Sequence, residues 1–279
     1  MTTGANDPPY ETRPLSPKAA TAAGVYDWML GGSTHTDDDA RVAGQLLGAM
    51  PMIARTMRYN REFLQRGVRF LCQAGIRQFL DLGSGVPTVG NVHEIAQHEA
   101  PGARVVYVDY NQPAVDKGRE LLAGNPDATC IQADLREPAR IFAHPEVRAL
   151  LDLDQPVALL MIAVLHFIGD DEHPGDLVES YTRRLSPGSY LALTHGARID
   201  DASRLRAQQT VAVAAYDYGV FERTFVRSAE EIRTLFGAAE LVEPGLVYLP
   251  DWRPADPGYT PDDEDESRIV GMGGIARLD

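Results

Sequence analysis

Residues 79–85 read FLDLGSG, at the end of a predicted strand and just before a predicted helix, Val89–Glu99. Glycines at such a junction let the backbone turn tightly and leave space for a ligand. Dinucleotide-binding folds use a related loop with the spacing GxGxxG, and their pyrophosphate lies over the N-terminus of the helix. Here the glycines fall at positions 83, 85 and 90, and the carboxylate of Asp81 would repel a pyrophosphate. The stretch therefore favours an α/β fold that binds a ligand other than a dinucleotide.

Three acids lie at the ends of three successive predicted strands. Asp81 can hold a cationic amino-acid group, such as the ammonium of S-adenosylmethionine, directly or through water. Asp109, the last residue of VVYVD, can accept both hydroxyls of a ribose, a group that NAD and S-adenosylmethionine share. Asp134, in ADLR at 133–136, can bind the amino group of an adenine. For each acid the alternative is a turn or a helix cap at a strand end, which is common in α/β proteins, most of all for Asp134.

These acids and their neighbours form a predicted cofactor site. Its members in the α/β part of the chain are Asp81, Gly83, Ser84, Gly85, Asp109, Tyr110, Asp134 and Leu135.

The chain alternates between strand and helix patterns after Gly75. The predicted strands are Gln78–Leu82, Arg104–Val108, Thr129–Gln132, Val157–Ile162, Tyr190–Thr194, Leu241–Leu249 and Arg268–Ala276. The predicted helices between them are Val89–Glu99, Gln112–Leu122, Glu146–Leu150, Gly175–Leu185 and Ser228–Phe236. Repeated βα units predict a Rossmann-like, mostly parallel, seven-stranded sheet with helices on both faces.

The last two predicted strands differ from the rest. Between them lies a loop, Pro250–Glu266, that carries four prolines and the acidic run PDDEDE. No helix fits in this loop, so we expect the two strands to pair antiparallel as a long hairpin.

The N-terminal part of the chain is predicted to be helical. Prolines make residues 1–15 a poor helix or strand, so we expect a flexible arm there. Residues 16–75 form a helical cap, and residues 76–279 form the α/β core with which it is integrated. The cap begins at Ser16, an N-cap followed by Pro17, and continues through Asp37–Met50 and Pro51–Ala74.

Together, DLGSG at 81–85, VVYVD at 105–109 and ADLR at 133–136 resemble the class I S-adenosylmethionine-dependent methyltransferases, from about Gln78 to the C-terminus. The resemblance implies a seven-stranded sheet with one antiparallel strand near its edge. Five segments also resemble an actinobacterial methyltransferase family whose members mostly lack an assigned substrate. They are YDWMLGG at 26–32, NREFL at 60–64, FLDLGSGVPTVGNVHE at 79–94, AVLHF at 163–167 and WRP at 252–254.

The same resemblance implies that residues of the cap contact the cofactor, and the matching positions are Tyr26, Asn60 and Arg61. An aromatic face near the sulfonium stabilises that cation, by about 0.5–2 kcal/mol in general. Arg61 can pair with the methionine carboxylate. The alternatives are packing of a cap helix on the core for Tyr26 and a surface ion pair for Arg61.

Composition narrows the classes of partner. The formal net charge is −14, which disfavours nucleic acid and anionic membranes. Cys72 and Cys130 lack metal-ligand spacing and are expected to be buried thiols. The N-terminus has no signal-peptide pattern, and no apolar run reaches the roughly 18 residues of a membrane span. We therefore expect a cytoplasmic protein.

Two histidines follow predicted strands at the edge from which a methyltransferase reaches its acceptor. His166 is a candidate proton acceptor, and the alternative is a histidine that merely shapes the pocket. His195 is a weaker candidate. HE at 93–94 lacks the third ligand of HExxH, because position 97 is Gln97, so no metal site is predicted.

The sequence thus favours transfer of a methyl group from S-adenosylmethionine to a small-molecule acceptor. We expect the cap and a helical stretch, Asp201–Tyr218, to close over that acceptor. Two alternatives remain: a cofactor-binding protein without turnover, and an NAD-dependent oxidoreductase. The acceptor atom and the oligomeric state do not follow from any motif.

Overall fold

The computed structural model describes residues 20–86, 90–199, 204–220 and 223–279. Runs of buried aliphatic residues form its central sheet, since a strand covered on both faces needs apolar side chains on both sides. The strands are β1 (Gln78–Leu82), β2 (Arg104–Asp109), β3 (Ala128–Gln132), β4 (Ala158–Met161), β5 (Tyr190–Gly196), β6 (Glu240–Leu241), β7 (Val247–Tyr248) and β8 (Gly271–Arg277).

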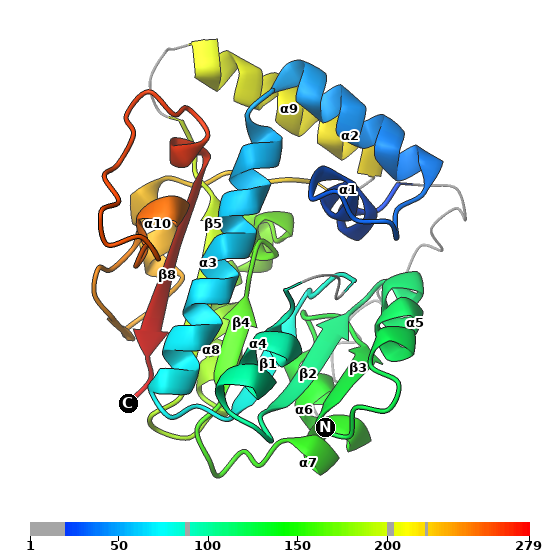
Figure 1. Cartoon of the computed structure of the whole chain (residues 1–279), viewed down its shortest axis with the longest axis vertical. Coiled ribbons are helices and arrows are strands. Elements are labelled where there is room, and N and C mark those ends of the chain that lie inside the picture. The colour runs from blue at the N-terminus through cyan, green and yellow to red at the C-terminus, as the bar shows by residue number, and fades with distance from the viewer. Residues whose placement is uncertain (1–19, 87–89, 200–203, 221–222) are drawn as a thin grey trace, which may run out of the picture.

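The sheet has the order β3-β2-β1-β4-β5-β8-β6, and β7 also pairs with β8 (Figure 1). The pairs among β1 to β5 are parallel, so the carboxyl ends of these five strands share one edge. β8 runs antiparallel to β5 over its full length and antiparallel to β6 and β7 on its other side. The α/β sheet with an antiparallel C-terminal strand is confirmed.

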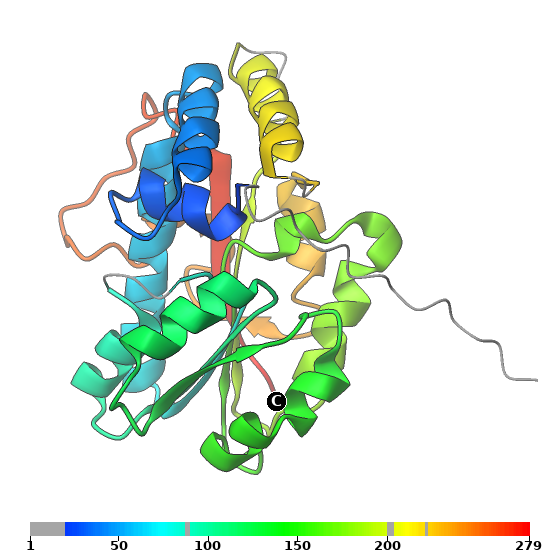
Figure 2. The same cartoon turned by 90° about the vertical axis from the view of Figure 1, so that its right-hand side faces the viewer.

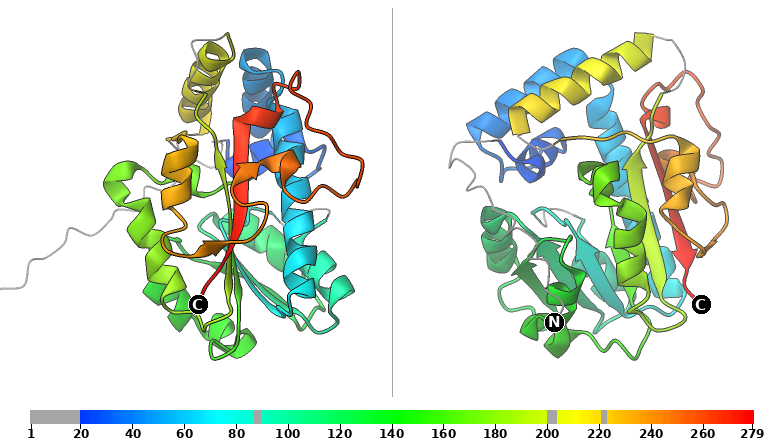
Figure 3. Two further views of the ribbon diagram at one scale, coloured as in Figure 1. Left: turned by 90° about the vertical axis from the view of Figure 1, so that its left-hand side faces the viewer. Right: turned by 180° about the vertical axis from the view of Figure 1, so that it is seen from behind.

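Helices cover both faces of the sheet, as predicted (Figure 3). On one face lie α3 (Ile53–Gln73), α4 (Val92–Glu99) and α5 (Gln112–Leu121). On the other lie α6 (Pro138–Ala143), α7 (Pro145–Leu150), α8 (Pro174–Thr182) and α10 (Ala229–Thr234). Side chains alternate between the faces: Phe79 and Tyr107 pack with the first group, and Leu80 and Leu82 with the second.

A small second core lies above the carboxyl ends of the parallel strands. It joins α1 (Ala22–Met29), α2 (Asp37–Ala49) and α9 (Arg204–Val220), with apolar side chains from all three. α9 lies along α2 although the two are far apart in sequence, and Figure 2 shows α1 beneath α2. The helix predicted over Asp201–Tyr218 is therefore present from Arg204 and packs with the N-terminal helices, and its first three predicted residues lie outside the described residues.

The predicted N-cap falls outside the described residues, and one predicted strand of the hairpin has the wrong bounds. Ser16 and Pro17 lie outside the described residues, and the first described helix begins at Ala22, after Thr21 caps it by accepting from Gly24 N–H. The predicted strand Leu241–Leu249 is two short strands, because Pro244 has no N–H and Gly245 adopts a φ of +92°. Both short strands still pair antiparallel with β8, as the hairpin required.

Two further features differ from expectation. The start of the last predicted strand, Arg268–Val270, is a short 3-10 turn, so β8 begins at Gly271. Helix α6, which has six residues, was not predicted. No described helix is long and apolar enough to cross a membrane.

Candidate active site

The glycine loop after β1 lies at the carboxyl edge of the sheet. Gly83 and Gly85 have φ values of +67° and +61°, in the left-handed region that favours glycine. The N–H groups of Gly83 and Ser84 donate to the carbonyl of Val108 at 2.8 and 3.2 Å and so tie the loop to β2. A Cβ on Gly83 would lie 2.2 Å from Cγ2 of Val164. The absent side chain of Gly83 therefore makes room for the turn after β4.

Two N-terminal helices also border this loop. A Cβ on Gly85 would lie 3.4 Å from the Cβ of Ala23 in α1. A Cβ on Gly90 would lie 2.3 Å from Nε2 of Gln65 in α3. The loop is thus enclosed by α1, α3, β2 and the end of β4.

The carboxylate of Asp109 is buried at the end of β2 and holds the glycine loop. Its Oδ2 accepts from Gly85 N–H at 2.8 Å, and its Oδ1 accepts from Asn111 N–H at 2.9 Å. Burial raises the pKa of this carboxyl, and the two hydrogen bonds oppose the rise. Each oxygen retains acceptor capacity for a ligand hydroxyl. The next residue, Tyr110, is 44% exposed.

Asp81 is the second buried carboxylate at this edge. It lies in β1 opposite Tyr107 of β2, on the face of the sheet that α3 covers. Burial raises the pKa of its carboxyl to about 7; the guanidinium of Arg61 lowers it and the charge of Asp109 raises it. A cation bound beside Asp81 would favour its charged form.

Arg61 of α3 contacts Tyr26 of α1, and its charge acts on Asp81. The guanidinium carbon of Arg61 lies 5.6 Å from the centre of the Tyr26 ring. The Nε of Arg61 is buried and has no hydrogen-bond partner within the described part of the chain. A buried donor without a partner is costly, so this N–H is suited to an anionic ligand group.

A chain of hydrogen bonds connects the cap to the ends of β4 and β5. The backbone N–H of Ala163 donates to Oγ1 of Thr194 at 2.8 Å, and that hydroxyl donates to Oδ1 of Asn60 at 2.7 Å. Nδ2 of Asn60 donates to the hydroxyl of Tyr26 at 3.0 Å, which in turn donates to the carbonyl of Met57 at 3.2 Å. Sequence reasoning did not identify Thr194, because nothing in its strand distinguishes it.

Ala163 is unusual in its backbone. Its φ is +52°, which costs a residue with a Cβ of the order of 1 kcal/mol or more. The hydrogen bond from Ala163 to Thr194 holds this conformation directly after β4. The turn that carries His166 therefore starts from a strained residue that Thr194 stabilises.

The side chain of Asp134 binds Arg136 within the turn that follows β3. Its Oδ1 accepts from Arg136 N–H at 2.9 Å, and its carboxylate pairs with the Arg136 guanidinium at 3.3 Å. This is the turn role that the sequence left open as the alternative. Leu135 is buried, and its carbonyl accepts from the hydroxyl of Tyr181 at 2.6 Å.

His195, in β5, has both ring nitrogens engaged. Its Nδ1 lies 2.9 Å from the carbonyl of Gly196, and its Nε2 lies 2.7 Å from Nη1 of Arg227. A carbonyl only accepts and a guanidinium only donates, so Nδ1 carries the proton and Nε2 accepts. Burial lowers the pKa of His195 to about 4; the hydrogen bond to Gly196 opposes the lowering, and the charge of Arg227 contributes to it.

His166 lies in a 3-10 turn, Leu165–Phe167, after β4. Its ring centre is 6.0 Å from that of His195 and 4.2 Å from that of Phe167. Burial lowers the pKa of His166 to about 3, and the neighbouring His195 and Arg227 contribute to the lowering. The imidazole is therefore neutral at physiological pH and can accept a proton only as a weak base.

His93 and Glu94 have local partners. Nδ1 of His93 lies 2.8 Å from the hydroxyl of Tyr107, and Glu94 accepts from the N–H groups of Gly90 and Asn91 at the start of α4. Among the described residues, no group of three or more His, Cys, Asp or Glu side chains is placed to hold a metal ion.

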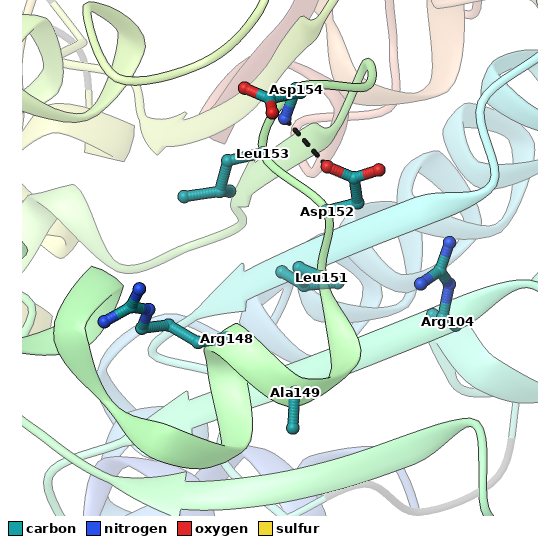
Figure 4. A pocket seen from close by; sticks show the side chains of 7 residues that line it. All are labelled: Arg104, Arg148, Ala149, Leu151, Asp152, Leu153 and Asp154. Atoms are coloured by element: carbon teal, nitrogen blue, oxygen red, sulfur yellow. Dashed lines mark hydrogen bonds between the residues drawn. The ribbon is translucent and has the colours of Figure 1, made fainter.

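Figure 4 shows a surface pocket lined by Arg104, Arg148, Ala149, Leu151, Asp152, Leu153 and Asp154. Arg104 is the first residue of β2, and the other residues belong to the end of α7 and the loop after it. Oδ1 of Asp152 accepts from Asp154 N–H at 3.1 Å. This pocket lies at the amino end of the strands, opposite the glycine loop, and so is separate from the candidate active site.

Comparison with known proteins covers nearly the whole chain. Residues 10–279 match a family model described as S-adenosyl methyltransferase. The crystal structure of a candidate methyltransferase from Thermobifida fusca is similar with a TM-score of 0.87 and 40% identity, over 97% of this chain and 99% of the other. A DUF574-family protein from Streptomyces avermitilis gives a TM-score of 0.86 and 35% identity, over 94% and 98%. No match was found among curated proteins.

Proposed function

The chain belongs to the S-adenosyl methyltransferase family, and from this we propose that it methylates a small molecule held beside the carboxyl ends of β4 and β5. When bound, S-adenosylmethionine supplies a methyl group already activated on a sulfonium. The protein then has to bind the cofactor, align the acceptor and exclude water.

The residues around the glycine loop fit this cofactor. We assign Arg61, which has a buried Nε without a partner in the described residues, to the methionine carboxylate, and the buried Asp81 to the ammonium group. Asp109 is assigned to the ribose hydroxyls, with Tyr110 beside it, and the ring of Tyr26 to the sulfonium. Asp134 and Leu135 are assigned to the adenine end, although Asp134 would have to share its carboxylate with Arg136.

The observation that carries this assignment is the buried Nε of Arg61, which lacks a partner in the described residues, together with the effect of the Arg61 charge on the buried carboxyl of Asp81. A half-buried guanidinium near a buried carboxyl of raised pKa suits a ligand that brings one anion and one cation. The amino-acid end of S-adenosylmethionine has these two charges at adjacent positions.

A small acceptor is supported by the cap and by the overall charge. α1, α2 and α9 lie over the carboxyl edge, and the net charge of −14 disfavours a nucleic-acid substrate. His166 is the histidine that remains a candidate proton acceptor, whereas His195 uses Nε2 to bind Arg227. We also propose a cytoplasmic location, in which the buried free thiols of Cys72 and Cys130 stay reduced.

Calorimetric titration tests the cofactor assignment. We expect S-adenosylhomocysteine to bind and NAD not to bind. Arg61→Met should weaken the binding of S-adenosylhomocysteine roughly 10- to 100-fold, because a hydrogen bond to a charged group contributes about 1.5–3 kcal/mol. Arg58→Met is the matched control, since Arg58 is an exposed arginine on the same helix. Equal affinities of the two variants for S-adenosylhomocysteine would show that Arg61 does not bind the cofactor.

A labelled methyl donor tests the class of acceptor. The purified protein is incubated with radiolabelled S-adenosylmethionine and separate pools of small metabolites, proteins and nucleic acids. We expect label in the small-metabolite pool. Label confined to protein or nucleic acid would refute the small-molecule proposal and leave the cofactor assignment intact.

A further inference from the structure

Arg227 is an arginine buried beside the carboxyl ends of β4 and β5, with 4% of its surface exposed. Its Nη1 donates to the carbonyl of Leu165 at 3.1 Å and to Nε2 of His195 at 2.7 Å. Its Nη2 donates to the carbonyl of Ile168 and to Oδ1 of Asp170, both at 2.7 Å, and its Nε donates to the same Asp170 oxygen at 3.2 Å. A guanidinium has five N–H donors, and all five are used here.

The groups that accept these hydrogen bonds belong to two segments, which flank the proposed position of the methyl acceptor. Leu165, Ile168 and Asp170 form the turn after β4, and His195 lies near the end of β5. The backbone adds two contacts, since Arg227 N–H donates to the carbonyl of Gly196 at 3.2 Å and Phe225 N–H donates to that of His166 at 2.8 Å. The segment of Arg227 is therefore bound to both sides of the edge.

We propose that Arg227 is a positioning residue, which holds His195 as a hydrogen-bond acceptor and fixes the turn that presents His166 to the methyl acceptor. This inference rests on the proposed function for the role of His166. Its geometric part, the fixed turn and the fixed tautomer of His195, is independent of methyl transfer.

Burial keeps the two imidazoles neutral, and the charge of Arg227 acts in the same direction. The titratable and charged groups that act on the His166 ring are His195, from β5, and Arg227. Asp170 faces Arg227 from the turn, but its side chain is 87% exposed, so water screens it. Burial and the guanidinium together hold the pKa of His166 at about 3 and that of His195 at about 4. Both rings therefore stay neutral in the pH range in which a free imidazole would become charged.

Nitrogen NMR of the histidine rings, recorded on the full chain between pH 5 and pH 9, tests the proposal. The His166 and His195 signals are assigned with His166→Gln and His195→Gln. In the wild type we expect neither ring to titrate and His195 to carry its proton on Nδ1. In Arg227→Met we expect His195 to populate both tautomers and the ring-nitrogen signals of His166 to shift.

Arg198→Gln is the matched control. Arg198 is also near the end of β5, but its side chain is 38% exposed and pairs with Glu231 at 2.9 Å. We expect the spectra of both histidines to be unchanged in this variant. An equal change in Arg198→Gln and Arg227→Met would attribute the effect to general loss of charge and overturn the proposal.

A second pair of variants covers the case in which Arg227→Met does not fold. The amide oxygen of Gln can accept from Nη1 of Arg227, whereas Leu leaves that N–H without a partner. We expect His195→Gln to preserve the His166 signal and His195→Leu to shift it. The same His166 spectrum in both variants, or an Nε2–H tautomer of His195 in the wild type, would overturn the proposal. Calorimetry with S-adenosylhomocysteine tests the proposed function separately.

Discussion

The two halves of the carboxyl edge are held together in different ways. In the half formed by β1 and β2, a strand-end carboxylate binds backbone groups of the adjacent loops, as when Asp109 accepts from the N–H groups of Gly85 and Asn111. In the half formed by β4 and β5, side chains from distant segments meet: Thr194 binds Asn60, and Arg227 binds the turn after β4.

The difference separates what a motif can specify from what the tertiary structure must supply. A ligand bound by backbone turns and strand-end acids leaves a compact pattern in the sequence, whereas an acceptor site assembled by long-range contacts leaves none. We call these the cofactor half and the acceptor half. The cofactor half should therefore fail when one local residue is changed, and the acceptor half when a distant contact is lost.

Asp109→Ala is expected to have the largest effect and tests the cofactor half. It removes the proposed ribose acceptor and leaves two N–H groups without partners. Affinity for S-adenosylhomocysteine should fall at least about a hundredfold, since each hydrogen bond to a charged group contributes about 1.5–3 kcal/mol. Calorimetry measures the loss.

Asp116→Ala is the control for that experiment. Asp116 lies on the exposed face of α5 and accepts from Gln112 at 2.6 Å. Its removal should change stability by no more than about 0.5 kcal/mol and leave the affinity unaltered. Normal binding by Asp109→Ala would show that the local pattern does not make the site.

Gly83→Ala tests a contact between the two halves, where Val164 occupies the space beside Gly83. The left-handed φ and the clash with Val164 should together destabilise the fold by roughly 2–4 kcal/mol, measured by urea unfolding. In a double-mutant cycle, Val164→Ala should recover about 1 kcal/mol of this loss. Purely additive effects would mean that the two halves are not coupled at this position.

Sequence reasoning located the cofactor half because each of its residues has a local cause. Asp81 and Asp109 were identified from strand ends, and the structure buries both at one edge beside the glycine loop. Asp134 forms the turn that the sequence kept as an alternative, because it accepts from Arg136 N–H. Both residues belong to the motif ADLR, so the same motif is compatible with a turn and with binding of adenine. The roles of all three toward a cofactor stay predictions.

The acceptor half could not be predicted in the same way. Arg227 follows no recognisable motif, and its partners lie 32 to 62 positions away along the chain. His195 was a candidate base because its strand position resembles that of His166, yet only the coordinates show Arg227 bound to its Nε2. The fold was predicted more completely than the site, since alternating strands and helices are visible as periodic patterns. The short strands β6 and β7 were merged because two residues each show no period.

Thr194→Val tests a long-range contact of the acceptor half, the hydrogen bond from Thr194 to Asn60. The variant keeps the shape of the side chain but removes the donor to Asn60 and the acceptor for Ala163 N–H. We expect a loss of roughly 1–3 kcal/mol in the free energy of unfolding, because buried polar groups lose their partners. Thr194→Ser keeps the hydroxyl and should be clearly more stable than Thr194→Val. If the two variants are equally stable, the hydrogen bonds of Thr194 with Asn60 and Ala163 contribute nothing measurable to the free energy of unfolding.

The pH dependence of cofactor binding is the smallest expected effect and belongs to the cofactor half alone. Burial raises the pKa of Asp81 to about 7, and binding of an ammonium group requires the ionised carboxylate. About one-tenth of the protein is ionised at Asp81 one unit below that pKa and about nine-tenths one unit above it, so affinity for S-adenosylhomocysteine should rise roughly tenfold from pH 6 to pH 8 and then level off. The pKa values of His166 and His195, about 3 and about 4, keep the acceptor half out of this window. Asp81→Asn should bind more weakly with no such slope, and a slope that persists in this variant would assign the titration to another group.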